Sequence, residues 1–266
     1  MSKPGEFYTI KLQTLAYEPE GGIVLKRKKW AGLLLAIVMV VAGCSQASST
    51  GGQSEEGQQG DKPLTLYFAR HGETLFNKQG RMQGWSDSPL TEKGKETAIH
   101  LGKGLADISF VAAYSSTSER AIDTAQYLLD GRSVPLITDK NLREMNFGEW
   151  EAESAEKIME QYPAIWEFDP SFKSPVGGES IPELLKRTQT AVERIIRENK
   201  AKGGNVLVVT HGLATMNFIY HLDPRSISID GPLPNGSVTT VEWKDGALKV
   251  LKVGDESYIK KGEQQK

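Results

Sequence analysis

The stretch that decides the fold is Leu64–Asn77, which reads LTLYFARHGETLFN. Its mostly apolar first half is typical of a buried strand, and an arginine, His71 and a glycine follow where that strand should run into a loop. The pattern recurs at Val206–Val209, an apolar run followed by a threonine, His211 and a glycine. Ligands of open α/β sheets bind outside the carboxyl ends of the strands. We therefore expect the two histidines to converge on one crevice.

Apolar periodicity along the rest of the chain predicts strands that alternate with helices. The predicted strands are residues 64–69, 110–114, 134–138, 206–209, 238–243 and 248–253, and the predicted helices are residues 91–108, 118–129, 180–203 and 213–221. Ser180 and Glu183 match a capping box at the start of the third helix. This alternation predicts an α/β fold of three layers, α/β/α, with a mostly parallel central sheet and an antiparallel edge.

The composition of the 266-residue chain argues against several classes of protein. A formal net charge of −2 and a pI near 6.2 give no electrostatic reason to expect nucleic acid. The single cysteine excludes an internal disulfide and a thiolate metal cluster. Because the four histidines include no closely spaced pair, we expect no dedicated zinc site, and nothing in the sequence calls for a metal or another cofactor.

Residues 26–43 have the pattern of a secretion signal. A basic cluster precedes an apolar run, Trp30–Gly43, of about 14 residues, which is short for a membrane span. The run ends at Cys44, and the sequence VAGC resembles a bacterial lipoprotein signal, in which cleavage precedes the cysteine and its sulfur is lipidated. We therefore expect a lipid anchor on the extracytoplasmic face of a bacterial cell membrane. The alternative is an uncleaved anchor, or a buried core helix with an ordinary buried cysteine.

Four other segments complete the predicted domain organisation. Residues 1–25 are an upstream extension, and either translation starts later, next to the basic cluster, or the extension is real and disordered. Residues 44–62 hold Ser, Gly, Gln and acidic residues without a large apolar side chain, which predicts a disordered tether. Residues 63–253 form the folded domain, one domain by its length. Residues 254–266 are predicted to be a charged, frayed tail.

Six blocks of this domain carry a specific pattern. They are Arg70–Asn77 (RHGETLFN), Gly80–Gly94 (GRMQGWSDSPLTEKG), Ser115–Ala125 (SSTSERAIDTA), Leu142–Glu151 (LREMNFGEWE), Gly177–Ser180 (GGES) and Val208–Gly212 (VVTHG). In content and in order they resemble the histidine phosphatase superfamily, in its phosphoglycerate-mutase-like branch. The resemblance covers about residues 64–253 and implies that family's fold and a phosphohistidine mechanism.

The resemblance implies a role for each of five side chains. His71 would be the nucleophile, attacking phosphorus through one ring nitrogen while the other donates to a backbone carbonyl that fixes the tautomer. Arg70 and Arg120 would depress the pKa of His71 and bind phosphoryl oxygens. His211 would contact an equatorial oxygen. Glu144, with a raised pKa, would protonate the leaving group and later activate water.

Four more residues are placed at the substrate. Asn77 would add a neutral donor, Gln83 and Gly84 match substrate-contacting positions of the mutase branch, and Gly212 stands in the block of the second histidine. Residues 153–174, where family members vary their substrate lid, give no recognisable specificity.

Other chemically suggestive residues are interpreted as structural. The aromatic residues Trp85, Trp150, Trp166 and Phe168 could wall a substrate pocket, but aromatic residues at such positions more often pack in the core. Asp87, His100 and His221 are also taken as structural.

The resulting prediction is a membrane-tethered phosphomonoester hydrolase that acts on a phosphorylated small molecule. Short spacings between the blocks favour hydrolysis, since glycolytic mutases carry longer insertions there. Phosphoryl transfer of the mutase type is one alternative. A non-catalytic lipoprotein that binds phosphorylated ligands is the other, and retention of His71 and Glu144 argues against it. The oligomeric state and the substrate are left open.

Overall fold

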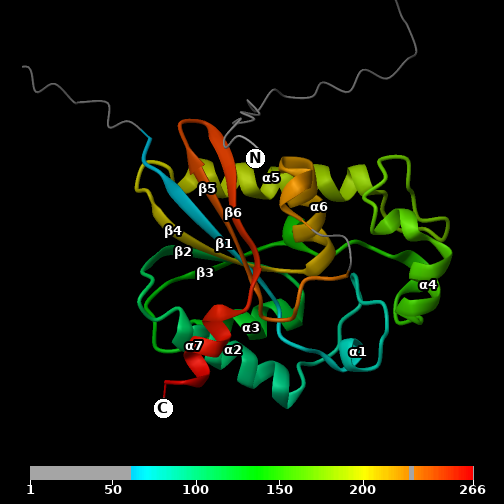
Figure 1. Cartoon of the computed structure of the whole chain (residues 1–266), viewed down its shortest axis with the longest axis horizontal. Coiled ribbons are helices and arrows are strands. Elements are labelled where there is room, and N and C mark those ends of the chain that lie inside the picture. Colours follow the sequence, from blue (N-terminus) through cyan, green and yellow to red (C-terminus); the bar gives the residue numbers. More distant parts are fainter. Residues whose placement is uncertain (1–60, 228–230, 266) are drawn as a thin grey trace, which may run out of the picture. The chain divides into compact units, whose positions relative to one another are not determined.

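The computed structural model describes residues 61–227 and 231–265, and its centre is a six-stranded sheet in the order β3-β2-β4-β1-β5-β6 (Figure 1). The strands are β1 (Leu64–Arg70), β2 (Phe110–Ser116), β3 (Leu136–Asp139), β4 (Gly204–Thr210), β5 (Val238–Lys244) and β6 (Ala247–Asp255). Neighbours among β3, β2, β4 and β1 are parallel, whereas β5 and β6 pair antiparallel. The predicted mostly parallel sheet with an antiparallel edge is confirmed.

Helices cover both faces of the sheet, as the alternating pattern predicts. The helices are α1 (Leu75–Lys78), α2 (Glu92–Gly104), α3 (Glu119–Leu128), α4 (Ala155–Gln161), α5 (Ile181–Asn199), α6 (Gly212–Leu222) and α7 (Ser257–Glu263). Single 3₁₀ turns are η1 (Lys140–Leu142), η2 (Gly148–Trp150), η3 (Pro163–Ile165) and η4 (Pro224–Ser226). α5 and α6 lie on one face and α2, α3 and α7 on the other (Figure 1).

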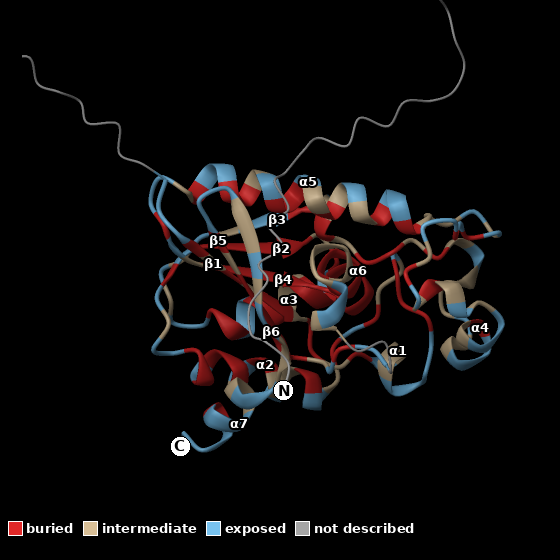
Figure 2. Cartoon of the chain, turned by 45° about the horizontal axis from the view of Figure 1, so that its top comes forward, coloured by how far each residue is buried: buried red, intermediate tan, exposed pale blue. Residues whose placement is uncertain are grey.

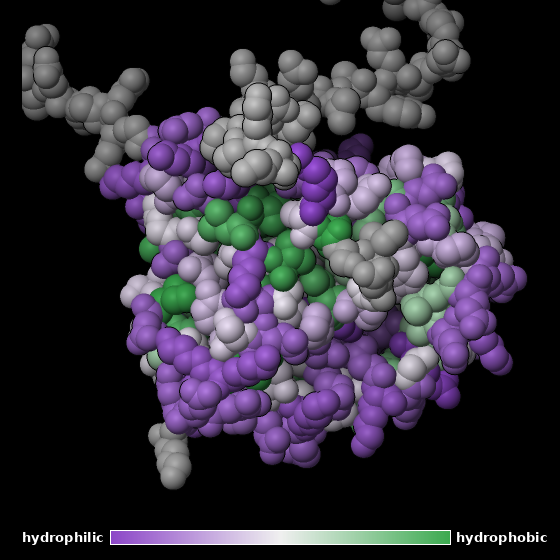
Figure 3. Space-filling view, in the orientation of Figure 1, coloured by the Kyte–Doolittle hydropathy of each residue, from purple (hydrophilic) through white to green (hydrophobic). Residues whose placement is uncertain are grey.

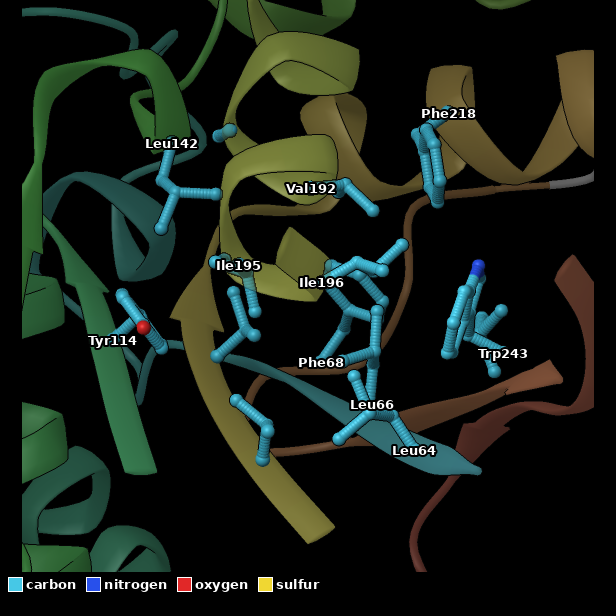
Figure 4. Close-up of a cluster of buried hydrophobic side chains, with 14 of the residues drawn as sticks. Leu64, Leu66, Phe68, Tyr114, Leu142, Val192, Ile195, Ile196, Phe218 and Trp243 are labelled. Carbon is cyan, nitrogen blue, oxygen red and sulfur yellow. The ribbon is translucent and has the colours of Figure 1, made fainter. Parts of the chain in front are cut away.

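The core under α5 and α6 is built from alternate residues of the strands. Leu66 and Phe68 of β1 point toward Ile195 and Ile196 of α5, and Phe218 of α6 closes the cluster (Figure 4). Each such side chain contributes about 1.5–3 kcal/mol when fully buried. This packing fixes the two helices against the strands whose ends carry the histidines.

α5 and α6 are buried to different extents. α5 begins with the predicted capping box, in which Ser180 and Glu183 each bond the other's backbone. Buried and exposed residues alternate along its length, so one side faces the sheet and the other faces solvent (Figure 2). α6 is buried on all sides from Gly212 to Ile219. A helix that is apolar all round is enclosed by other elements. The start of α6 is therefore held rigidly inside the domain.

The predicted frayed tail at 254–266 is wrong. β6 continues to Asp255, and α7 follows and packs against α2. The contact is made by glycines: a Cβ at Gly104 would clash with the carbonyl of Tyr258, and one at Gly262 would clash with the carbonyl of His100. Charged residues are frequent in the segment, so its composition hides a helix that docks through close approach at two glycines and through Tyr258 and Ile259, which pack against the core.

The predicted extension, signal peptide, lipidated Cys44 and nearly all of the tether lie outside the described residues. Within the described part of the chain, no helix has both the length and the apolar character needed to cross a membrane. The face seen in Figure 3 is largely hydrophilic, and its hydrophobic residues gather over β6 and α6, where edge-strand residues such as Leu248 and Val250 are half-buried.

Candidate active site

The site lies at the carboxyl ends of three neighbouring parallel strands. Arg70 at the end of β1 is in register with Thr210 at the end of β4, and the backbone N–H of His71 donates to the carbonyl of Thr210 at 3.0 Å. His211 therefore lies beside His71, and their ring centroids are 5.2 Å apart. The predicted convergence of the two histidines is confirmed.

His71 is held as a neutral imidazole with a defined tautomer. Its Nδ1–H donates to the carbonyl of Gly72 at 2.8 Å, because a carbonyl can only accept. Its Nε2 accepts from Nε–H of Arg120 at 3.2 Å. Burial, followed by the charges of Arg120 and Arg70, lowers the pKa of His71 well below its ordinary value. The ring presents a lone pair on Nε2, as a nucleophile requires.

His211 has the opposite tautomer. Its Nδ1 lies 3.0 Å from an Nη2 nitrogen of Arg120, and a guanidinium can only donate, so Nδ1 accepts. The proton of the neutral ring is then on Nε2, which donates to Oγ of Ser116 at 2.8 Å. Burial and the charge of Arg120 lower the pKa of His211 well below its ordinary value. Arg120 thus fixes both imidazoles.

Arg120, on the first turn of α3, is completely buried and its guanidinium is enclosed by acceptors. Besides the two imidazoles, it donates to the carbonyls of Gly84 and Ser86 at 2.9 and 3.1 Å. It also pairs with Oδ1 of Asp87 at 2.8 Å. Asp87, taken as structural, therefore positions this arginine. The resemblance implies that Arg120 binds phosphoryl oxygens, whereas in the structure each of its nitrogens donates to a protein acceptor.

The carboxylate of Glu151 organises the loop around Arg120. It accepts from the backbone N–H groups of Gly84, Trp85 and Ser86 at 2.8–3.0 Å, and from Oγ of Ser86. A Cβ at Gly84 would clash with the carbonyl of Met145, so this approach requires glycine. The loop carbonyls can therefore face the buried guanidinium, and the predicted contact of Gly84 with substrate stays a prediction.

Glu144 lies against the start of α6. Its Oε1 accepts from the N–H groups of Met145 and Ala214 at 2.9 and 2.8 Å, and its Oε2 accepts from that of Leu213 at 2.9 Å. Burial raises the pKa of Glu144, although these three hydrogen bonds and the charge of Arg120 act in the opposite direction. Since Oε2 has one donor and Oε1 has two, the open position for a proton is on Oε2.

Arg70 lies beside the start of α6. It donates to the carbonyl of Leu233, and burial, partly offset by the charge of Glu144, lowers its pKa to about 10. Its buried Nε–H has no hydrogen-bond partner among the described residues. A Cβ built at Gly212 would lie 3.3 Å from that nitrogen, so glycine leaves room for the guanidinium.

Asn77 has a defined amide orientation. Its Oδ1 accepts from the N–H of Thr74 and from Nδ2 of Asn235, both at 3.2 Å, and the same Nδ2 of Asn235 donates to the carbonyl of His71 at 3.0 Å. The NH₂ group of Asn77 is therefore left to donate elsewhere, as its predicted role requires. By contrast, the buried Gln83 bonds Thr74 and Ser88 through its amide, and its predicted contact with substrate stays a prediction.

The sequence reasoning missed Ser116, Glu151 and Asn235. Ser116 ends a third strand at the same edge of the sheet, and Glu151 stands in one of the six blocks, so both carry a signal that could have found them. Asn235 lies in an irregular loop and carries none.

The aromatic residues divide into two groups. Trp150 packs on Tyr162 with ring centroids 4.5 Å apart, and the buried Phe168 packs on Tyr220 at 5.0 Å. Trp166 packs against the same buried apolar cluster as Trp150 and Phe168. Packing is therefore confirmed for three of the four aromatic residues. Trp85 is 42% exposed and its indole N–H donates to the carbonyl of Glu144 at 3.1 Å.

The site brings two neutral imidazoles and two guanidiniums together at the carboxyl ends of parallel strands. Guanidinium donors match phosphoryl oxygens, so this is an α/β protein whose site suits a phosphoryl group. Within the described residues, no group of three His, Cys, Asp or Glu side chains could hold a metal ion.

Comparisons with known proteins agree with this class. The model of the histidine phosphatase superfamily (branch 1) matches residues 66–256. The chain therefore belongs to this family.

Relatives of both kinds, phosphatase and mutase, are similar to the chain. A metal-independent phosphoserine phosphatase from Arabidopsis thaliana is 35% identical over 212 residues, which cover 77% of this chain and 87% of the relative. A 2,3-bisphosphoglycerate-dependent phosphoglycerate mutase 2 from Gloeobacter violaceus is 35% identical over 173 residues, 61% of this chain and 78% of the relative. The crystal structure of phosphoglycerate mutase from Bacillus anthracis is 37% identical with a TM-score of 0.68, covering 77% of this chain and 98% of that one.

Removal of the acceptor of His211 should weaken the phosphoryl site. Ser116→Ala leaves the Nε2–H of His211 and the backbone N–H of Ser118, just before α3, without their acceptor, so we expect the dissociation constant for inorganic phosphate to rise at least about 5- to 10-fold, the value of one buried hydrogen bond. Ser115→Ala is the matched control, because this neighbouring buried hydroxyl donates to the backbone carbonyl of Ser116 rather than to a side chain of the site. Titration calorimetry measures both. Equal affinities in the two variants would contradict the role given to Ser116.

Proposed function

We propose that the protein is a phosphomonoester hydrolase that acts through a phosphohistidine on His71. The observation that carries the proposal is the neutral His71 ring, whose Nε2 lone pair is aimed at the guanidinium of Arg120 in a buried site. Phosphoryl transfer needs mainly positioning and charge stabilisation, and this site supplies fixed cations and neutral donors.

In the first step, the phosphoryl oxygens accept the hydrogen bonds that Arg120 donates to the imidazoles in the absence of substrate. Nε2 of His71 is thereby released to attack phosphorus. The P–O bond to the leaving group breaks as the N–P bond forms. Glu144 transfers its proton from Oε2 to the leaving oxygen, so that an alcohol departs and Glu144 becomes a carboxylate. The NH₂ group of Asn77 donates to the transferring group, whereas the one N–H of neutral His211 stays on Oγ of Ser116, so that His211 lines the site without donating.

In the second step, water replaces the alcohol. The carboxylate of Glu144 accepts a proton from the attacking water, the N–P bond breaks, and inorganic phosphate leaves. His71 returns to its neutral form and Glu144 is again protonated. The charges of Arg70 and Arg120 act in both steps, since both pass through a similarly charged transition state.

A mutase is the second candidate, because the similar proteins include both a phosphatase and a mutase. A mutase must keep its phosphorylated intermediate away from water. The short spacings between the six blocks leave little chain for the insertions that would do so, which favours hydrolysis.

Hydrolysis of p-nitrophenyl phosphate by the full chain is the direct test. We expect turnover that falls by about 10³-fold or more in His71→Ala, because the nucleophile is removed. With 3-phosphoglycerate, release of inorganic phosphate should exceed conversion to 2-phosphoglycerate. The reverse ratio would favour the mutase. Equal inactivity of wild type and His71→Ala across a broad phosphoester panel would favour a non-catalytic binding protein.

The dependence of activity on pH follows from two shifted pKa values. His71 must be neutral, and its lowered pKa places the acidic limb below 6.5, so that activity is kept as the pH falls through neutrality. Glu144 must be protonated, so activity is lost as the pH rises through its raised pKa. With glycerol 3-phosphate, a poor leaving group, Glu144→Gln should lower kcat by about 10²- to 10⁴-fold and remove the alkaline limb. An alkaline limb that persists in Glu144→Gln would assign it to another group.

We also propose that the domain is tethered to the extracytoplasmic face of a bacterial membrane through lipid on Cys44. The support is the sequence alone: a basic cluster, a short apolar run and the single cysteine at its end. Residues 44–62 would form a flexible tether with a root-mean-square span of about 24 Å. The substrate would then be a phosphorylated small molecule outside the cell.

Metabolic labelling with an alkyne-tagged palmitate tests the tether. When the full chain is expressed in a bacterium, we expect label and protein together in the membrane fraction, and mass spectrometry should find a mature protein that begins at Cys44. Cys44→Ser should carry no label. Recovery of unlabelled protein with residue 1 intact would exclude the lipid anchor.

A further inference from the structure

Arg143 is held at the edge of the site without an acceptor. Its guanidinium carbon lies 5.1 Å from the centroid of the Trp85 ring, a stacking distance for a cation on an aromatic face. Its Nε–H is buried and has no hydrogen-bond partner, and none of its terminal nitrogens bonds an acceptor in the described part of the chain. Buried donors are nearly always paired, so the unpaired Nε–H of Arg143 calls for a physical reason.

The other arginines that stack on aromatic rings in the described residues also have hydrogen-bond acceptors. Arg132 lies over the ring of Phe110 and also donates to the carbonyls of Gly102 and Ile108. Arg194 lies over the ring of Tyr114 and is paired with carboxylates on α5 and β3. Stacking therefore supplements structural hydrogen bonds at both positions. At Arg143 the stacking is present and the hydrogen bonds are absent.

The place of Arg143 next to the catalytic groups is also specific. Arg143 directly precedes Glu144, and the indole N–H of Trp85 donates to the carbonyl of Glu144 at 3.1 Å. Trp85 directly follows Gly84, whose carbonyl binds Arg120. The Arg143–Trp85 pair thus lies between the segment that holds the acid and the loop that holds the buried arginine.

The backbone around Arg143 is fixed by hydrogen bonds, whereas its guanidinium is held by stacking on Trp85. Arg187 of α5 donates to the carbonyls of Arg143 and Glu144, and its guanidinium is anchored by both carboxylate oxygens of Glu179. A rigid main chain and a stacked side chain present the donors of Arg143 in a defined direction at little cost in entropy.

From these observations we infer that Arg143, stacked on Trp85, is a subsite for a carboxylate on the leaving group of the substrate. This inference rests on the proposed function, because the leaving group must lie beside Glu144 to receive its proton. A guanidinium fork matches a carboxylate in shape, and one such cation balances one negative charge. The substrate class is therefore small phosphomonoesters that carry a carboxylate near the ester oxygen. A second phosphate, with nearly two charges, would call for a further cation.

A matched pair of esters tests the subsite: 3-phosphoglycerate and glycerol 3-phosphate differ only in a carboxylate against a hydroxymethyl group. The measured quantity is the ratio of kcat/KM for the two esters. We expect wild type to favour 3-phosphoglycerate and Arg143→Met to lower the ratio by about 10- to 100-fold, mainly through KM, as for a lost charged hydrogen bond. Arg143→Lys, which keeps the charge but not the fork, should fall between them.

Arg132→Met is the control variant, because it also removes a stacked arginine but lies on the other face of the sheet. It should leave the ratio unchanged. An Arg143→Met ratio equal to that of wild type would overturn the inference, as would an equal loss on both esters, which would indicate a structural role.

Binding separates a failure of the subsite from a failure of the proposed function. Titration calorimetry of both esters with His71→Ala, and with His71→Ala combined with Arg143→Met, gives the same comparison without turnover. One outcome would be that wild type hydrolyses neither ester, while His71→Ala binds 3-phosphoglycerate more tightly than glycerol 3-phosphate and loses this preference in the double variant. The subsite would then stand and the hydrolase proposal would fall. Binding without discrimination would remove the subsite.

Discussion

The buried guanidinium of Arg120 is the constraint on which the rest of the site depends. A fully buried cation is costly unless acceptors surround it, and breaking such an arrangement costs several kcal/mol. Here the acceptors are two imidazoles, one carboxylate from Asp87 and carbonyls of a loop that Glu151 ties together. Burial, reinforced by the charge of Arg120, lowers the pKa of both imidazoles and keeps them neutral. One residue therefore links the packing of α3, the shape of the loop and the protonation state of the nucleophile.

The sheet and α6 supply the remaining geometry. Register between β1 and β4 places the two histidines side by side, and α6 begins directly after His211 and is enclosed on all sides. Its first free N–H groups bind the carboxyl of Glu144, which comes from a different segment of the chain. The rigid start of α6 thus positions the acid, and the register of β1 and β4 positions the nucleophile, while burial raises the pKa of the acid and lowers that of the nucleophile.

The residues that sequence reasoning could place are those whose local pattern decides their position. Two apolar runs ending in a histidine and a glycine were enough to bring His71 and His211 together, and the capping box marked the start of α5. Contacts between remote segments were not predictable in this way. The docking of α7 depends on close approach at glycines. Ser116 and Asn235 act through side-chain hydrogen bonds to partners far along the chain, which periodicity and composition do not encode.

The most direct measurement is the ¹⁵N NMR spectrum of the four histidine side chains, assigned by single substitutions and followed from about pH 5.5 to 8, the range in which an ordinary imidazole titrates. If Arg120 holds both rings as described, His71 shows the Nδ1–H tautomer and His211 the Nε2–H tautomer, and neither titrates across this range. An imidazolium form of either ring that appears with a pKa at or above 6.5, or the opposite tautomer at His71, would contradict the arrangement around Arg120.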